Sequence, residues 1–194
     1  STAQTVVAGT GSYPFTKYVL DASGSGEDIR INALKLRLTG GGANTADDLT
    51  NCQLFDGATA LNSGSNVVNP SNSDNLVDGT SVEKTFSMDT GLIVPKGTIK
   101  TLTMKCNLIS GISIPEYYQW GLTDVDATIT ATGMTSGQTV DGSDSISATE
   151  DGRVINGATS GTVSFALDSS SPSMKWVSAG STDNTLAVFR FNAT

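Results

Sequence analysis

Apolar and polar residues alternate one by one through many short stretches of this chain, and this period of two most constrains its fold. In residues 101–108, the inward set is Leu102, Met104, Cys106 and Leu108. Successive side chains of an extended strand point to opposite faces, so the pattern predicts strands with one buried face. Glycine-rich turns separate these strands, and no stretch keeps the apolar spacing of a helix for long. We expect an all-β chain folded as a two-sheet antiparallel sandwich with long polar loops.

The clearest strand signal covers residues 29–42 and contains one break in phase. Isoleucines at odd positions come first, and leucines at even positions follow. An extra residue in one strand shifts its side chains from one face to the other. We therefore predict a β-bulge near Ala33.

The end of the chain repeats its beginning. Residues 173–194 align without a gap on residues 2–23, with Ala179-Gly180 on Ala8-Gly9, 171 residues apart. A fixed long period is typical of repeat proteins, although two strands that follow glycine turns also resemble each other by chance. We expect a sandwich unit in residues 1–172 and a terminal strand segment in residues 173–194. That segment is either the start of a next repeat or a donor strand.

Charge and composition exclude several classes of function. The formal net charge is −8, which disfavours binding to nucleic acid or to an anionic membrane surface. No apolar run is long enough to span a bilayer. Histidine is absent, which removes the commonest general base and excludes Ser–His–Asp and Cys–His sites. Few charges, many hydroxyl residues and many glycines favour an all-β secreted protein.

Both cysteines lie in phase with inward residues of their strands. Cys106 alternates with polar neighbours, and Cys52 is in phase with Leu54. Two inward thiols on separate strands favour a core disulfide. Two buried free cysteines, packed as small apolar residues, are the alternative.

Several phrases together resemble a known kind of protein. These are "YVLDASGSGEDIRI", "LTNCQLFDG", "VPKGTIKTLTMKC" and "SSSPSMKWVSAGST". In this order they are similar to tandem-repeat domains of very large secreted or cell-surface proteins of uncultured bacteria. The resemblance implies immunoglobulin-like sandwiches joined head to tail outside the cell, with no enzymatic activity, and "SSPS…AGST" as the opening of the next repeat.

Acidic residues supply weak candidates for a calcium site, since calcium binds oxygen ligands. The first place to look is residues 141–151, with Asp141, Asp144, Glu150 and Asp151. Solvated charges on turns explain these residues equally, and no cofactor is otherwise expected.

Two aromatic residues share one strand face. Tyr118 and Trp120 could form a platform on which a sugar ring stacks, or they could fill the core of the sandwich.

The repeat leads to a functional hypothesis. An edge strand left open in one unit would be completed by an identical neighbour, which builds a head-to-tail filament, stalk or surface layer. Alternatively, the terminal segment folds back and completes its own sandwich. The predicted junction residues are Val6, Phe15, Tyr18, Leu20, Val177, Leu186, Phe189 and Phe191. The competing function is an adhesin or carbohydrate-binding module.

Overall fold

The computed structural model describes residues 2–42, 46–71, 74, 76, 79–122, 129–140, 151–161 and 163–193. The chain divides into two compact units: unit 1 is residues 1–159 and unit 2 is residues 160–194. The division therefore comes before residue 173, where the terminal copy of the repeat begins. Unit 2 holds that copy and the strand that precedes it.

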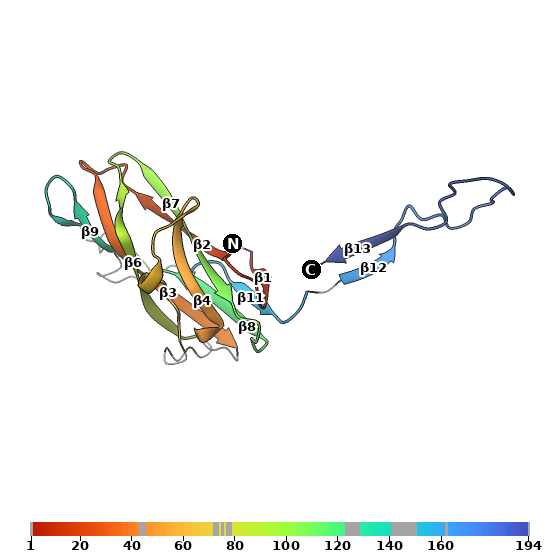
Figure 1. Cartoon of the computed structure of the whole chain (residues 1–194), viewed down its shortest axis with the longest axis horizontal. Helices are drawn as coiled ribbons and strands as arrows, with labels where there is room; N and C mark the ends of the chain where they lie inside the picture. The colour runs from red at the N-terminus through yellow and green to blue at the C-terminus, as the bar shows by residue number, and fades with distance from the viewer. Residues whose placement is uncertain are drawn as a thin grey trace. The chain divides into compact units, whose positions relative to one another are not determined.

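Unit 1 is an all-β sandwich, as the alternation predicts (Figure 1). Its larger sheet runs in the order β1-β11-β8-β3-β9-β10, and β6 also pairs with β3. These strands are β1 (Gln4–Val7), β3 (Ile29–Gly42), β6 (Ser81–Val94), β8 (Glu116–Gly121), β9 (Ile129–Gly133), β10 (Thr139–Val140) and β11 (Ile155–Ala158). The second sheet runs in the order β2-β7-β4-β5. Its strands are β2 (Tyr13–Asp21), β4 (Leu49–Asp56), β5 (Thr59–Ala60) and β7 (Ile99–Leu108).

One strand pair departs from the antiparallel expectation: β1 and β11 are parallel. Parallel neighbours need a long connection, and nearly all of unit 1 lies between these two strands. The consequence is directional, because the chain leaves unit 1 along β11 in the same direction in which it entered along β1.

The predicted bulge in β3 is confirmed. The pairings of β3 with β6 and with β9 both shift register between Ile31 and Ala33. Two 3-10 turns, Ala46–Asp48 and Gly64–Asn66, interrupt the strands of unit 1. None of the helices within the described residues has the length and apolar character to cross a membrane.

A single apolar core fills the space between the two sheets of unit 1. Its largest fully buried side chains include Phe15, Leu36, Phe86, Leu102 and Trp120. The Phe86 and Trp120 rings meet edge to face, with centroids 5.5 Å apart. Along β7, the buried face is the one that the alternation selects.

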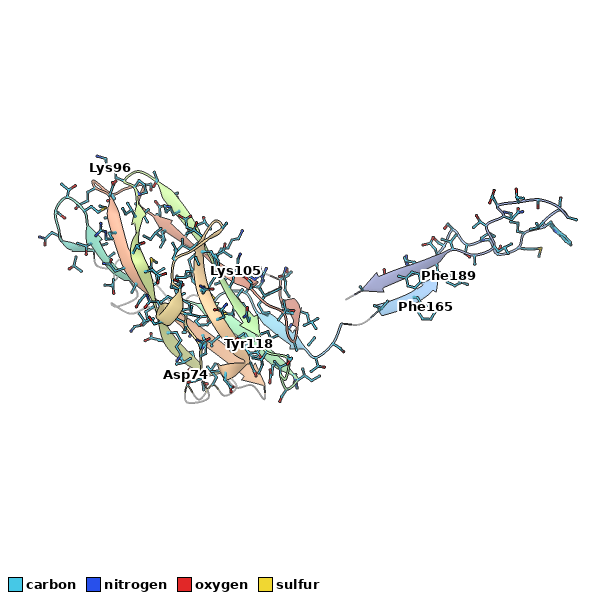
Figure 2. The ribbon with its side chains drawn as sticks, in the orientation of Figure 1. Asp74, Lys96, Lys105, Tyr118, Phe165 and Phe189 are labelled. Atoms are coloured by element: carbon cyan, nitrogen blue, oxygen red, sulfur yellow. A yellow bond between two sulfur atoms is a disulfide. The ribbon has the colours of Figure 1, made fainter. Side chains whose placement is uncertain are left out.

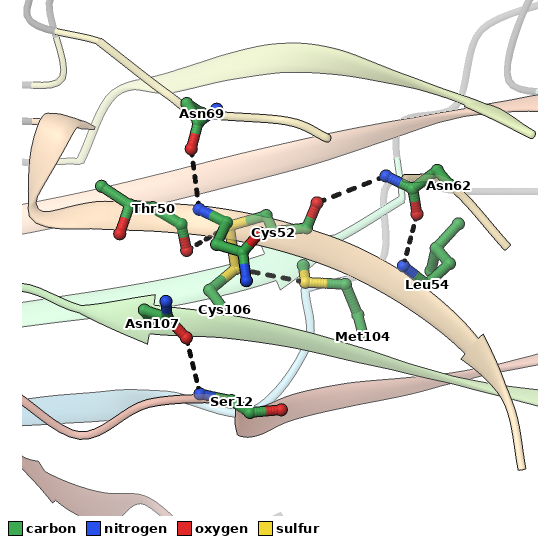
Figure 3. Close-up of a disulfide and its surroundings, with 10 residues drawn as sticks. Ser12, Thr50, Cys52, Leu54, Asn62, Asn69, Met104, Cys106 and Asn107 are labelled. Atoms are coloured by element: carbon green, nitrogen blue, oxygen red, sulfur yellow. Dashed lines mark hydrogen bonds between the residues drawn. A yellow bond between two sulfur atoms is a disulfide. The ribbon is translucent and has the colours of Figure 1, made fainter. Parts of the chain in front are cut away.

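Cys52 on β4 and Cys106 on β7 form the disulfide that the sequence favours (Figure 3). Both residues are fully buried. The bond joins neighbouring strands of one sheet, rather than the two sheets of the sandwich. Nearby, the buried Asn62 accepts a hydrogen bond from the Leu54 N–H (2.8 Å), which holds the chain after β5 against β4.

Unit 2 is a two-stranded antiparallel ribbon of β12 (Val163–Leu167) and β13 (Phe189–Ala193). β13 belongs to the terminal copy of the repeat. Among the described residues of unit 2, β13 pairs with β12.

Candidate functional site: two copies of one strand-forming segment

The N-terminal copy, residues 2–23, forms β1, a tight turn and β2. Gly9 adopts φ +83°, a left-handed conformation that favours glycine. The backbone N–H and the side-chain hydroxyl of Thr10 both donate to the Val7 carbonyl, at 3.1 and 2.6 Å. Ser12 also has a positive φ of 51°, and its N–H donates to the Asn107 side chain at 2.7 Å (Figure 3). The turn is thereby fixed to β7.

The C-terminal copy forms the same turn. Gly180 adopts φ +84° and Asp183 adopts φ +59°, at the positions that align with Gly9 and Ser12. The N–H and hydroxyl of Ser181 donate to the Ser178 carbonyl at 3.1 and 2.8 Å, as Thr10 does to Val7. The similarity therefore extends from sequence to backbone conformation, including two positive φ angles at non-glycine positions, which are uncommon. This agreement favours a true repeat over chance resemblance.

The two copies differ sharply in burial. The N-terminal copy contributes to the core, whereas the aligned residues of the C-terminal copy are exposed. The exposed fractions are 2% for Val6 and 46% for Val177, 1% for Phe15 and 71% for Leu186, and 7% for Tyr18 and 55% for Phe189. The C-terminal copy thus carries the side chains of a core strand without the core.

Secondary structure follows the available partners. Residues 175–178 align with β1 but form no strand, and the described residues of unit 2 contain no counterpart of β11. Residues 189–193 do form a strand, since β12 is present beside them. The segment therefore has the sequence to form two strands and, within unit 2 as described, a partner for only one.

Unit 2 exposes an unusual amount of apolar surface for its size. Trp176 is 92% exposed and Met174 80%, and Phe165 and Phe191 are each more than two-thirds exposed. Figure 2 shows the Phe165 and Phe189 side chains on the β12–β13 ribbon. A lone two-stranded ribbon is marginally stable in water, and clustered apolar side chains mark interaction surfaces.

Unit 1 has a complementary feature, because β2 is an edge strand of its sheet. Near the start of this edge, the Arg153 guanidinium donates to the Pro14 carbonyl at 3.2 Å. The second half, from Tyr18 to Ala22, has no strand beside its outer edge among the described residues. An open edge presents unpaired backbone groups to a further strand.

Beside this open edge lies an apolar groove of about 360 Å³, which we call the β2 groove. One wall consists of β2 and its continuation, through Tyr18, Leu20 and Ala22. The other comes from the larger sheet and includes Ile29, Ile129 and Val140. The Tyr18 hydroxyl is buried with no hydrogen-bond partner in the described part of the chain, and burial raises its pKa.

The predicted junction residues thus fall into three groups. Val6 and Phe15 lie in the core of unit 1, so their role there is packing within the unit. Tyr18 and Leu20 line the β2 groove. The remaining four, Val177, Leu186, Phe189 and Phe191, are exposed in unit 2.

The predicted ligand face is wrong. Tyr118 and Trp120 do share one face, but both side chains are buried, at 0% and 1% exposure. Tyr118 meets Phe15 edge to face (6.5 Å between centroids), and Trp120 packs on Phe86. The face that carries both rings is the inner face of β8, so no sugar can stack on them.

The Tyr118 hydroxyl belongs to a buried polar cluster that the sequence did not reveal. It lies 2.9 Å from an Asp48 carboxylate oxygen and 2.6 Å from a Glu116 carboxylate oxygen. Burial, reinforced by the nearby Asp48 charge, raises the pKa of Glu116. Both carboxylates are at least 95% buried, so this cluster braces the sandwich instead of facing a cleft.

The calcium hypothesis gains no support. Asp141, Asp144 and Glu150 lie outside the described residues, and Asp151 pairs with Arg37. Across the described ranges, no group of three or more acidic or cysteine side chains is arranged to hold a metal ion.

Comparison with known proteins yields no match to a family model, to a curated protein or to a solved structure. The function must therefore be argued from the geometry.

Proposed function

We propose that this chain is a structural repeat of an extracellular filament, stalk or surface layer, in which identical units join head to tail by strand pairing. The observation that carries the proposal is the mismatch between the two copies. The same segment with the same turn is buried in unit 1 and exposed in unit 2. The exposed apolar side chains of this segment would be removed from water if the segment entered the core of a neighbouring unit.

Two further observations support a head-to-tail arrangement. The chain enters unit 1 along β1 and leaves it along β11 in the same direction, which is compatible with units that follow one another head to tail. The proposed interface joins two different surfaces, the exposed terminal segment of one unit and the sandwich of the next, and such heterologous contacts extend into fibres unless the geometry closes a ring.

The Cys52–Cys106 disulfide supports an extracellular location, because disulfides persist mainly in oxidising compartments. The cohesion of such an assembly would come from main-chain hydrogen bonds and apolar packing, without catalysis.

The test is a protein that contains four copies in tandem, with residue 172 of each copy joined to residue 2 of the next. Electron microscopy should show straight rods whose length grows by a constant increment per copy. Sedimentation of the single chain over a wide concentration range measures whether separate chains also associate. Flexibly linked units, whose angles vary from particle to particle, together with a single chain that stays monomeric, would refute the proposal.

A further inference from the structure

The β2 groove and one face of the β12 strand are both apolar and both exposed. β12 carries Val163, Phe165 and Leu167 on one face, and they are 68%, 73% and 62% exposed. The groove is lined mainly by aliphatic side chains, with Asp21 and Ser25 among its few polar residues. An extended apolar strand fits such a surface better than a polar ligand does.

The internal repeat supplies the register. In unit 2, β12 pairs with β13 such that Val163 is opposite Ala193, Phe165 opposite Phe191, and Leu167 opposite Phe189. β13 aligns with the second half of β2 in the sequence repeat. Transferring the pairing places Val163 opposite Ala22, Phe165 opposite Leu20, and Leu167 opposite Tyr18.

The backbone hydrogen bonds agree with this transfer. The Ala22 N–H donates to the Thr98 carbonyl at 2.9 Å, and bonded pairs alternate along an antiparallel ladder. Tyr18 and Leu20 therefore also bond to β7, and the backbone groups of Lys17, Val19 and Asp21 point to the open edge.

The same alternation can be read in unit 2. The Asp168 N–H donates to the Val188 carbonyl at 2.8 Å, so residues 188, 190 and 192 direct their backbone groups toward β12. These positions align with Lys17, Val19 and Asp21. The backbone groups that face β12 in unit 2 thus align with those of β2 that have no strand partner among the described residues of unit 1.

The side-chain faces agree as well. Phe165 lies beside Phe191, with ring centroids 6.3 Å apart, so the two share a face of the ribbon. Phe191 aligns with Leu20, which lines the groove. A strand that pairs with β2 in this register therefore directs Val163, Phe165 and Leu167 into the groove, and Ser164 and Ala166 to solvent.

From these observations we infer that residues 163–167 of one copy insert beside Tyr18–Ala22 of a second copy, as an added antiparallel strand whose apolar face fills the β2 groove. The inference rests on the proposed head-to-tail function. It adds the inserted strand (β12), the surface that receives it (the β2 groove) and the residue-by-residue pairing. The sandwich of each unit is then completed by a strand that precedes it in the chain.

The test uses a two-copy protein, in which residues 1–172 are followed by residues 2–194. Cysteines replace Ala166 in the first copy and Val19 in the second. In the inferred register, Ala166 and Val19 form a hydrogen-bonded antiparallel pair. The Cα atoms of such a pair lie about 5.5 Å apart, within reach of a disulfide. The chain has no free cysteine among its described residues, so peptide mapping under non-reducing conditions identifies the new bond.

We expect the Ala166→Cys and Val19→Cys pair to cross-link nearly completely while the second sandwich stays folded. A control pair, Ser164→Cys with Val19→Cys, keeps the strand face but is two residues out of register, and should cross-link at least about tenfold less. Adding Phe165→Asp to the first pair should reduce its yield to a similar degree, whereas Ser164→Asp should not.

Absence of the bond, equal yields for the two pairs, or a bond that forms only when the second sandwich unfolds would overturn the inference. A synthetic peptide of residues 160–172, added to the 194-residue chain, gives an independent reading. It should shift the nuclear magnetic resonance signals of Val19 and Asp21, and a shift confined to other residues would also overturn the inference. Straight rods without the cross-link would leave the proposed function standing, whereas units at variable angles, together with a monomeric single chain, would refute it.

Discussion

The two copies of the repeat show what a core strand requires beyond its own sequence. Residues 2–23 and 173–194 share a turn, down to the φ angles of Gly9 and Gly180. In unit 1 the copy finds β7 and β11 as partners and forms two strands. In unit 2 it finds β12 alone and forms one. Local sequence sets the turn, whereas neighbouring strands decide whether the flanking residues pair and become buried.

The largest expected effect comes from a matched pair of truncations. Phe15→Ala should destabilise unit 1 by about 3–5 kcal/mol, because Phe15 is 1% exposed and its removal leaves a cavity. Leu186→Ala, at the aligned position in unit 2, should change the stability of unit 1 by less than about 0.5 kcal/mol. Urea unfolding followed by Trp120 fluorescence, in a Trp176→Phe background, measures both. Equal losses of unit 1 stability in the two variants would contradict the difference in burial between the two copies.

Reduction of the disulfide should have the next largest effect, again confined to unit 1. Cys52 and Cys106 are 54 residues apart, and closing a loop of this length stabilises a fold by about 2–4 kcal/mol. Urea midpoints with and without reductant give the loss. Hydrogen exchange of the Ala166 and Arg190 amides, which belong to a hydrogen-bonded pair of the β12–β13 ribbon, serves as the control in unit 2 and should be unchanged. A matching change there would show that the two units are not independent.

A smaller effect is expected from the shared turn. Gly9→Ala forces a side chain into a left-handed conformation and should destabilise unit 1 by about 1–2 kcal/mol. Gly180→Ala carries the same local strain at φ +84°. It should leave unit 1 unchanged, because in unit 2 the turn is not fixed to a core. The unfolding experiment above measures both, and a loss from Gly180→Ala equal to that from Gly9→Ala would show that unit 2 is coupled to unit 1.

The stability of unit 1 should also depend on pH through Glu116. The pKa of Glu116 is raised in the folded state above its ordinary value of 4.5, by burial and by Asp48. The folded state then binds the proton more tightly than the unfolded state, so this contribution to stability is fully present below pH 4.5 and is lost as the pH rises through the folded pKa. Glu116→Gln should remove this dependence.

The measurement for this prediction is unit 1 stability as a function of pH, in the wild-type chain and in Glu116→Gln. The stability of the wild type relative to the variant should fall as the pH rises from 4.5. Parallel profiles would show that Glu116 titrates as in the unfolded chain.

Much of unit 1 could be predicted from the sequence because its strands alternate cleanly. The bulge of β3 follows from the change of phase near Ala33, and the disulfide follows from two cysteines in inward phase. Alternation also placed Tyr118 and Trp120 on a common face, but it could not say whether that face is inner or outer. Tertiary packing decides this, because the face with both rings meets the second sheet, where Tyr118 contacts Phe15 of β2.

The candidate site was only partly predictable. The repeat identified both copies of the segment, but it did not identify β12, which has no counterpart in residues 2–23. The one signal was the alternation of Val163, Phe165 and Leu167. The β2 groove left no trace in the sequence, because an open edge is a property of sheet order.

Hydrogen exchange of the backbone amides along the open edge of β2 tests the central claim most directly. In the single chain, the Lys17, Val19 and Asp21 amides should exchange fast, while Leu20, bonded to β7, exchanges slowly. In the second copy of the two-copy protein, the same three amides should slow by about a hundredfold or more, since opening then breaks sheet hydrogen bonds. Unchanged exchange of these amides, with the second sandwich folded, would contradict completion of β2 by a neighbouring strand.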